Sequence, residues 1–164
     1  MAHSGLSMER LAVDRMLGKL AKWLRALGCD VVYLSQAKDE EILTQLQDGR
    51  ILVTRDRRAE TWQKHGKVFQ VRANDPKEQL REVFHGLHLS SMYSLQFSRC
   101  IRCNRILTRV GREQVRDLVP EHIWQTHRRF HMCDGCDRVY WSGTHSDRML
   151  KRLEELFAQC EEPG

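Results

Sequence analysis

Four cysteines form two pairs with the spacing that one tetrahedral metal ion requires. Each pair is a Cys-x-x-Cys turn; the first joins Cys100 and Cys103, and the second joins Cys133 and Cys136. Four thiolates bind zinc and leave no coordination position open for water, so such an ion stabilises a fold rather than catalyses a reaction. The spacing therefore predicts one structural zinc ion in the second half of the chain.

Two alternatives to this zinc site follow from the same residues. The four cysteines could form two disulfides, although paired cysteines in a reducing compartment more often bind metal. A histidine could also replace one cysteine ligand, and three histidines lie near the pairs: His127, His131 and His145. Cys29 and Cys160 have no partner in the pattern, and we expect both to be free thiols.

Four aspartates stand at or near the ends of apolar runs in the first half of the chain. They are Asp14, Asp39, Asp56 and Asp75. If the apolar runs are parallel strands, their carboxyl ends meet at one edge of a sheet, where ligands bind. Clustered carboxylates repel one another unless cations neutralise them. Oxygen ligands select Mg²⁺ or Mn²⁺, and such ions could activate water for attack on a phosphodiester.

Each aspartate also has a local explanation that competes with a metal site. Asp56 and Asp75 could cap helices, and Asp75 suits this role because a proline and a glutamate follow it in a helix-start pattern. Asp39 could be a first-turn acid that interacts favourably with the helix dipole. Asp14 has no obvious local role, since it stands between an apolar run and a basic helix.

The hydrophobic pattern predicts the scaffold that would position these residues. Short apolar runs predict strands at 11–13, 31–34, 51–53 and 68–71. Amphipathic patterns predict helices at 16–27, at 39–46, from about 57 and at 75–87, with Gly28 capping the first helix. This alternation predicts an α/β domain with a central parallel sheet and helices on both faces.

The second half of the chain has a different organisation and contains a stretch rich in arginine. A connector at 88–98 precedes a cysteine module at about 99–143, and an amphipathic helix is expected at 149–157. From Arg99 to Arg129 there are eight arginines and three acids, a net charge of +5 that equals that of the whole chain. Arginine suits phosphate because its planar guanidinium binds two oxygens at once. This stretch permits a polyanionic partner, and a solvated basic face is the alternative.

The composition also bears on the compartment. No apolar run approaches the ~20 residues that a membrane helix needs. The first residues lack the basic start and the apolar run of a secretory signal. We therefore expect an intracellular protein without membrane association, in the cytoplasm or the nucleus.

Three motifs follow one another in the first half: residues 13–25 (VDRMLGKLAKWLR), 39–43 (DEEIL) and 51–56 (ILVTRD). The second half adds the two Cys-x-x-Cys pairs and residues 138–145 (RVYWSGTH). Together, over nearly all of residues 9–157, these motifs resemble the Mut-7 C-terminal ribonuclease family. In animals such a domain can form the tail of a larger 3′–5′ exonuclease, so this chain could be a short isoform or a fragment.

The resemblance implies a fold and an activity. It implies a PIN-like three-layer nuclease domain at 8–90, followed by a zinc ribbon and a C-terminal helix at 98–158. It also implies hydrolysis of RNA with Mg²⁺ or Mn²⁺ as the catalytic ion. The implied catalytic acids, with the last one as a weaker fourth, are Asp14, Asp39, Asp56 and Asp75. The sequence departs from the family pattern at Lys38 and Asn74, where an acid is frequent, and both departures make the site less anionic.

Basic side chains would then hold the RNA backbone. The candidates are Arg15, Lys19, Lys22, Arg55, Arg102 and Arg105. Contacts with phosphates carry affinity rather than sequence choice, and they should be sensitive to salt. A rival hypothesis is a non-catalytic RNA-binding or adaptor module with a vestigial acid site. A third is a phosphoryl-transfer domain that forms an aspartyl phosphate at Asp56.

Overall fold

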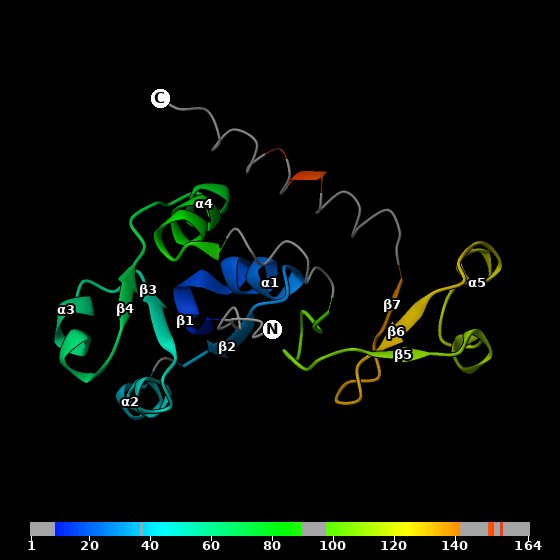
Figure 1. Cartoon of the computed structure of the whole chain (residues 1–164), viewed down its shortest axis with the longest axis horizontal. Coiled ribbons are helices and arrows are strands. Elements are labelled where there is room, and N and C mark those ends of the chain that lie inside the picture. The colour runs from blue at the N-terminus through cyan, green and yellow to red at the C-terminus, as the bar shows by residue number, and fades with distance from the viewer. Residues whose placement is uncertain (1–8, 37, 90–97, 142–150, 153–154, 156–164) are drawn as a thin grey trace, which may run out of the picture. The chain divides into compact units, whose positions relative to one another are not determined.

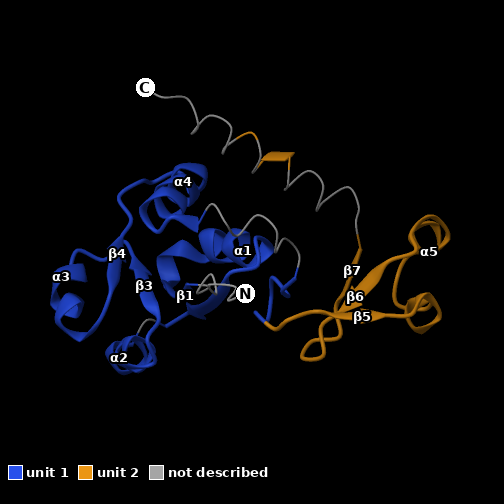
Figure 2. Ribbon diagram, in the orientation of Figure 1, with its two compact units in different colours: residues 1–104 blue, residues 105–164 orange. Residues whose placement is uncertain are grey.

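The structure is a computed structural model that describes residues 9–36, 38–89, 98–141, 151–152 and 155 (Figure 1). The chain divides into two compact units, residues 1–104 and residues 105–164 (Figure 2). This division falls within the cysteine module. The expected domain limits, 8–90 and 98–158, stay a prediction.

The first unit contains a four-stranded parallel sheet with the strand order β2-β1-β3-β4. Its strands are β1 (Arg10–Asp14), β2 (Asp30–Leu34), β3 (Ile51–Thr54) and β4 (Val68–Gln70). In the central pairings, Val13 lies opposite Tyr33 on one side and opposite Val53 on the other. The predicted α/β class and central parallel sheet are confirmed, and the carboxyl ends of all four strands lie at one edge.

The helices of the first unit begin and end close to the predicted residues. The predicted first helix starts with a 3-10 turn, η1 (Arg15–Leu17), and continues as α1 (Gly18–Ala26). Gly28 ends it with a φ of 93°, and the amide of Cys29 donates to the carbonyl of Leu24, so the glycine cap is confirmed. The remaining helices are α2 (Asp39–Gln47), α3 (Ala59–Trp62), η2 (Gln63–His65) and α4 (Pro76–Gly86).

The sheet is buried on both faces. The three apolar residues of β1 are fully buried, which is why this run reads as continuously apolar rather than alternating. On one face, Ala12 and Leu52 pack with Ile42 of α2 and Trp62 of α3. Figure 1 shows α1 and α4, which pack with each other, on the opposite side of the sheet from α2. The sheet is thus held rigidly enough to fix the positions of the residues at its edge.

Asp30 is the centre of a polar cluster at the start of β2. Nη1 of Arg50 lies 2.9 Å from Oδ1 of Asp30, and Nδ2 of Asn104 donates to the same oxygen at 2.7 Å. Only 11% of the Arg50 side chain and 18% of the Asp30 side chain are exposed. Burial raises the pKa of Asp30, but the hydrogen bonds from Arg50 and Asn104 outweigh it, so the pKa lies below its ordinary value of 3.8.

We expect Asp30→Ala to lower the free energy of unfolding by about 2–3 kcal/mol at pH 7, because it leaves the largely buried guanidinium of Arg50 without the carboxylate that pairs with it. The folded pKa is lowered, so this stabilisation is complete above about pH 4 and is lost as the pH falls through the folded pKa. Urea unfolding at pH 7 and pH 3 measures both effects.

Asp48→Ala is the matched control. Asp48 lies 3.8 Å from Nε of the same arginine, but its side chain is 58% exposed. The loss of Asp48 should therefore lower the free energy of unfolding by less than about 1 kcal/mol. Equal losses in the two variants would contradict the role of Asp30.

The second unit is built on a three-stranded antiparallel sheet with the order β5-β6-β7. Its strands are β5 (Thr108–Val110), β6 (Phe130–Met132) and β7 (Val139–Trp141), and its helices are η4 (Arg112–Val115) and α5 (Glu121–Thr126). Its core is small: Val115, Val119 and Phe130 are buried, and partly buried hydrophobic side chains surround them.

Trp124 and Arg112 hold the helical insert of the second unit together. The guanidinium of Arg112 lies 3.8 Å from the centre of the Trp124 ring and donates to the carbonyl of Trp124, while the indole nitrogen donates to the carbonyl of Arg112. Arg116 also lies over the ring, at 4.6 Å. Two arginines of the basic stretch are therefore occupied in packing as well as in carrying charge.

Several predictions concern residues outside the described part of the chain. They include most of the connector at 88–98, His145, Cys160 and much of the helix at 149–157. Within that last segment, Lys151, Arg152 and Glu155 are helical.

Candidate metal centre and aspartate site

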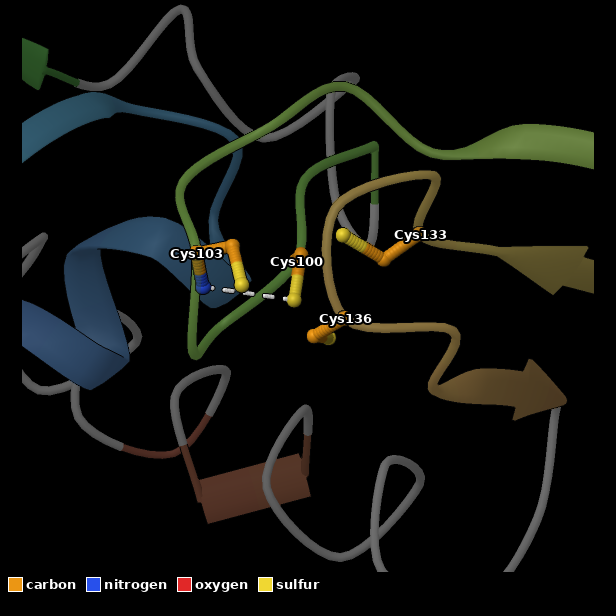
Figure 3. Close-up of side chains that lie close together, drawn as sticks. All are labelled: Cys100, Cys103, Cys133 and Cys136. Atoms are coloured by element: carbon orange, nitrogen blue, oxygen red, sulfur yellow. Dashed lines mark hydrogen bonds between the residues drawn. The ribbon is translucent and has the colours of Figure 1, made fainter.

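The four cysteines of the two pairs meet at one centre, as their spacing predicts. The Sγ atoms of Cys100, Cys103, Cys133 and Cys136 all lie within 4.8 Å of one another (Figure 3). Cys100 and Cys133 are buried, and the other two are half-buried. Among the described residues, this is the single group of three or more histidine, cysteine or acidic side chains that could hold a metal ion, and neither His127 nor His131 belongs to it.

In each Cys-x-x-Cys turn, a backbone amide of the turn donates to the sulfur of the first cysteine. In the first, the amide of Cys103 donates to Sγ of Cys100 at 3.3 Å (Figure 3); in the second, the amide of Gly135 donates to Sγ of Cys133 at 3.4 Å. Such bonds stabilise a thiolate, because they favour the charged form of the sulfur. One sulfur of each pair therefore accepts a hydrogen bond from its own turn.

Each turn closes on a residue in the left-handed region, directly after its second cysteine. Asn104 has a φ of 67° and Asp137 a φ of 58°. Their amides donate to the carbonyls of Cys100 at 2.8 Å and of Cys133 at 2.9 Å. Asn and Asp adopt this conformation more readily than other residues with side chains, so both turns follow from their sequences.

The first cysteine turn is part of the first unit because its backbone is hydrogen-bonded to α1 and β2. Arg25, which is 9% exposed, donates from Nη1 to the carbonyls of Ile101 at 3.0 Å and Arg102 at 3.1 Å. Its Nε donates to the carbonyl of Val31 at 2.9 Å, and Oδ1 of Asn104 accepts from the amide of Val31 at 2.9 Å. The turn therefore satisfies backbone groups on the outer side of an edge strand.

Cys29 is a buried free thiol, as its lack of a partner in the pattern suggests. Burial raises the pKa of this thiol to about 12, although nearby Arg99 acts in the opposite direction. A thiol with this pKa stays protonated at neutral pH, so Cys29 packs as a small apolar side chain.

Asp14 ends β1 and is held by a hydroxyl from the neighbouring strand. It is 6% exposed, and Oγ1 of Thr54 donates to its Oδ2 at 2.7 Å. The contact follows from the register, because Val13 pairs with Val53 and the next residues are Asp14 and Thr54. Oγ1 of Thr54 in turn accepts from the amide of Asp56 at 3.0 Å. One threonine hydroxyl thus joins two of the predicted acids.

Arg58 joins Asp56 to the third predicted acid, Asp39. Nη2 of Arg58 lies 3.1 Å from Oδ2 of Asp56, and Nη1 lies 3.9 Å from Oδ1 of Asp39. The backbone amide of Arg58 also donates to Oδ1 of Asp56, at 2.8 Å. The hydrogen bonds from the Arg58 side chain and then from its amide lower the pKa of Asp56, and Arg15 contributes a smaller Coulomb effect. A continuous set of contacts therefore links Asp14, Asp56 and Asp39; we call these three residues the aspartate site.

Asp75 has a different environment. Its Oδ1 accepts from the amides of Lys77 at 2.9 Å and Glu78 at 3.3 Å, so it caps α4, as its local alternative proposed. Asn74, one of the departures from the family pattern, accepts a hydrogen bond from Arg55. Within the described part of the chain, no hydrogen bond or ion pair of Asp75 or Asn74 reaches the aspartate site, and a catalytic role of Asp75 stays a prediction.

The sequence pattern alone did not single out Thr54 or Arg58. Thr54 could have been found as the one hydroxyl residue after the apolar run 51–53, because a buried hydroxyl needs a polar partner. The signal for Arg58 was its place two residues after Asp56, at the reach of an Asx-type turn.

The predicted RNA-binding residues are mostly at the surface. Arg15, Lys19, Lys22, Arg102 and Arg105 are exposed, whereas Arg55 is half-buried. Arg15 follows Asp14 directly, and Arg105 forms an ion pair with Asp134 at 3.2 Å. Their binding of RNA stays a prediction.

In the described part of the structure, no helix has both the length and the apolar character to cross a membrane.

Comparison with known proteins places the chain in a family. No match is found among curated proteins or among solved structures. The family model described as the Mut7-C RNAse domain matches residues 9–153, a range that includes the aspartate site and all four clustered cysteines. The chain therefore belongs to the Mut7-C RNAse domain family.

Proposed function

We propose that this chain is a metal-dependent ribonuclease that hydrolyses RNA phosphodiesters at Asp14, Asp39 and Asp56, in a PIN-like first unit. The family description, which names an RNase domain, supports the reaction class. The single observation that carries the proposal is the set of contacts through Thr54 and Arg58 that joins these three acids at one edge of the sheet. Thr54 contacts the carboxylate of Asp14 and the backbone amide of Asp56, and Arg58 contacts the carboxylates of Asp56 and Asp39.

The residues of the aspartate site fit a hard divalent ion. They offer carboxylate oxygens, which Mg²⁺ and Mn²⁺ prefer, and the guanidinium between Asp56 and Asp39 indicates that a cation is accommodated there. When bound, such an ion supplies an activated water and stabilises negative charge on the phosphate. Asp14, Asp39 and Asp56 would hold it, and the Thr54 hydroxyl would orient the carboxylate of Asp14.

The cysteine centre would be a structural zinc site. Four sulfur ligands leave no open position for substrate, so the ion would hold the two turns together and take no part in the chemistry.

The predicted basic residues would bind phosphates of the RNA backbone; they are Arg15, Lys19, Lys22, Arg55, Arg102 and Arg105. Their contribution should weaken as salt rises, because each phosphate contact releases counterions.

A non-catalytic RNA-binding or adaptor role is the second candidate. It is favoured by one observation: among the described residues, the aspartates do not form a group as compact as the cysteines do. In that case the cysteine module would bind RNA, and the aspartate site would be a remnant. The two candidates differ in whether RNA is cleaved.

An RNA-cleavage assay distinguishes them. Zinc-loaded wild-type protein is incubated with end-labelled single-stranded RNA, with and without added Mg²⁺ or Mn²⁺, beside the double variant Asp14→Asn/Asp56→Asn. We expect cleavage that needs the added ion and disappears in the double variant. RNA binding without cleavage in either ion would support the adaptor role, and cleavage that survives in the double variant would remove the aspartate site from the reaction.

A further inference from the structure

The side chain of Arg58 occupies the space between two of the acids of the aspartate site. Its Nη2 lies 3.1 Å from Oδ2 of Asp56, and its Nε lies 3.4 Å from Oδ1 and 3.3 Å from Oδ2. Its Nη1 faces Oδ1 of Asp39 at 3.9 Å. One guanidinium therefore covers both oxygens of Asp56 and reaches a second carboxylate from a different element.

The backbone of Arg58 is hydrogen-bonded at both its amide and its carbonyl, whereas its side chain is more than half exposed. Its amide donates to Oδ1 of Asp56 at 2.8 Å, and its carbonyl accepts from the amide and hydroxyl of Thr61 in α3 at 2.9 Å and 2.6 Å. The side chain itself is 57% exposed. Exposed ion pairs contribute little because water competes for both charges. The guanidinium can therefore leave the carboxylates without disturbing the turn that carries it.

We propose that Arg58 is the resident counter-cation of the aspartate site and competes with the divalent ion for Asp56 and Asp39. This inference rests on the proposed function. A divalent ion needs direct contact with carboxylate oxygens, and here the same oxygens are covered by a guanidinium. Two cations at one carboxylate also repel each other. Arg58 thus sets the concentration of Mg²⁺ or Mn²⁺ at which the site fills, and it lowers the repulsion among the acids until the ion arrives.

The neighbouring residue provides a matched control. Arg57 carries the same charge one position earlier and is exposed, but its guanidinium makes no ion pair with Asp39 or Asp56 in the described part of the chain. Arg57→Gln and Arg58→Gln change the net charge equally. A difference between them therefore reports the direct contact rather than the general field of the protein.

The inference can be tested without any assay of activity, by measuring the binding of Mn²⁺ to zinc-loaded protein. Calorimetry and the loss of the electron paramagnetic resonance signal of free Mn²⁺ both report this binding. We expect Arg58→Gln to bind Mn²⁺ about two- to fivefold more tightly than the wild type, the size appropriate to an exposed ion pair. Arg57→Gln should change the affinity less than about twofold. Circular dichroism melting of each variant checks that the fold is retained.

The possible failures are distinguishable. If the wild type binds Mn²⁺ in a way that Asp14→Asn/Asp56→Asn removes, but Arg58→Gln binds equally or more weakly, the competition is overturned and the metal site stands. If neither the wild type nor Arg58→Gln shows binding that depends on these aspartates, the proposed function fails as well. Binding in Arg58→Gln alone would be the strongest form of the expected result.

Discussion

Replacing Cys133 by serine is expected to remove the zinc ion and to unfold most of the second unit. Cys133 is fully buried, and its sulfur is one of four that share a single centre. A serine hydroxyl is not ionised at neutral pH and does not replace a thiolate ligand. We expect the zinc content, measured by mass spectrometry of the metal, to fall from about one ion per chain to a small fraction of that.

The expected effect on the fold is large because the second unit has little else to stabilise it. Its buried core in the described residues is formed around Val115, Val119 and Phe130. A unit of this size does not reach more than about 3–5 kcal/mol from its core alone, whereas structural zinc contributes about 10 kcal/mol or more. Hydrogen exchange in β5, β6 and β7 should therefore approach the rate of an unfolded chain in Cys133→Ser.

Cys29→Ala is the control for the cysteine substitution. Cys29 is equally buried but lies outside the sulfur cluster, so this variant should keep one zinc ion and the protection of the second unit. Full zinc loading of Cys133→Ser, or unchanged exchange in the three strands, would refute the assignment of the four cysteines as a structural site.

Replacing Asp14 by asparagine is expected to reduce RNA cleavage by about a thousandfold without loss of stability. Removing one negative ligand weakens both the binding of the ion and its alignment. The fold should tolerate the change because the asparagine oxygen can still accept from Thr54, and a nearly buried charge is removed. Single-turnover rates on end-labelled RNA and the melting temperature measure the two effects separately.

Asp48→Asn is the control for the charge change. Asp48 is an exposed aspartate that pairs with Arg10 at 3.0 Å and belongs to neither candidate site, so cleavage should stay within about twofold of the wild type. A rate in Asp14→Asn equal to that of the control would mean that Asp14 is not part of the reaction.

For Asp75, the local sequence pattern and the family resemblance predict different roles: a helix cap and a catalytic acid. The proline and glutamate that follow it predict a helix cap, and the structure contains that cap. The same pattern cannot say whether the carboxylate also faces the aspartate site. Asp14 had no local role in the sequence, and it is the acid that a neighbouring strand holds in the structure.

The features of this protein that a local pattern or a residue spacing specifies are determined by the sequence itself. The parallel sheet follows from apolar runs alternating with amphipathic segments, the cap at Gly28 from its freedom to adopt a positive φ, and the meeting of four cysteines from two pairs at the spacing of a metal turn. Each feature depends on residues within a few positions of one another, or on a pattern that few folds satisfy.

Tertiary structure alone decided the contacts that make up the aspartate site and anchor the first cysteine turn. Thr54 meets Asp14 because of the register of β1 and β3. Arg58, just before α3, reaches Asp39 at the start of α2 because both helices pack on the same face of the sheet. Asn104 meets Val31 across more than seventy residues. Such contacts depend on the packing of whole elements, and side-chain hydrogen bonds between distant segments leave no periodic trace in a sequence.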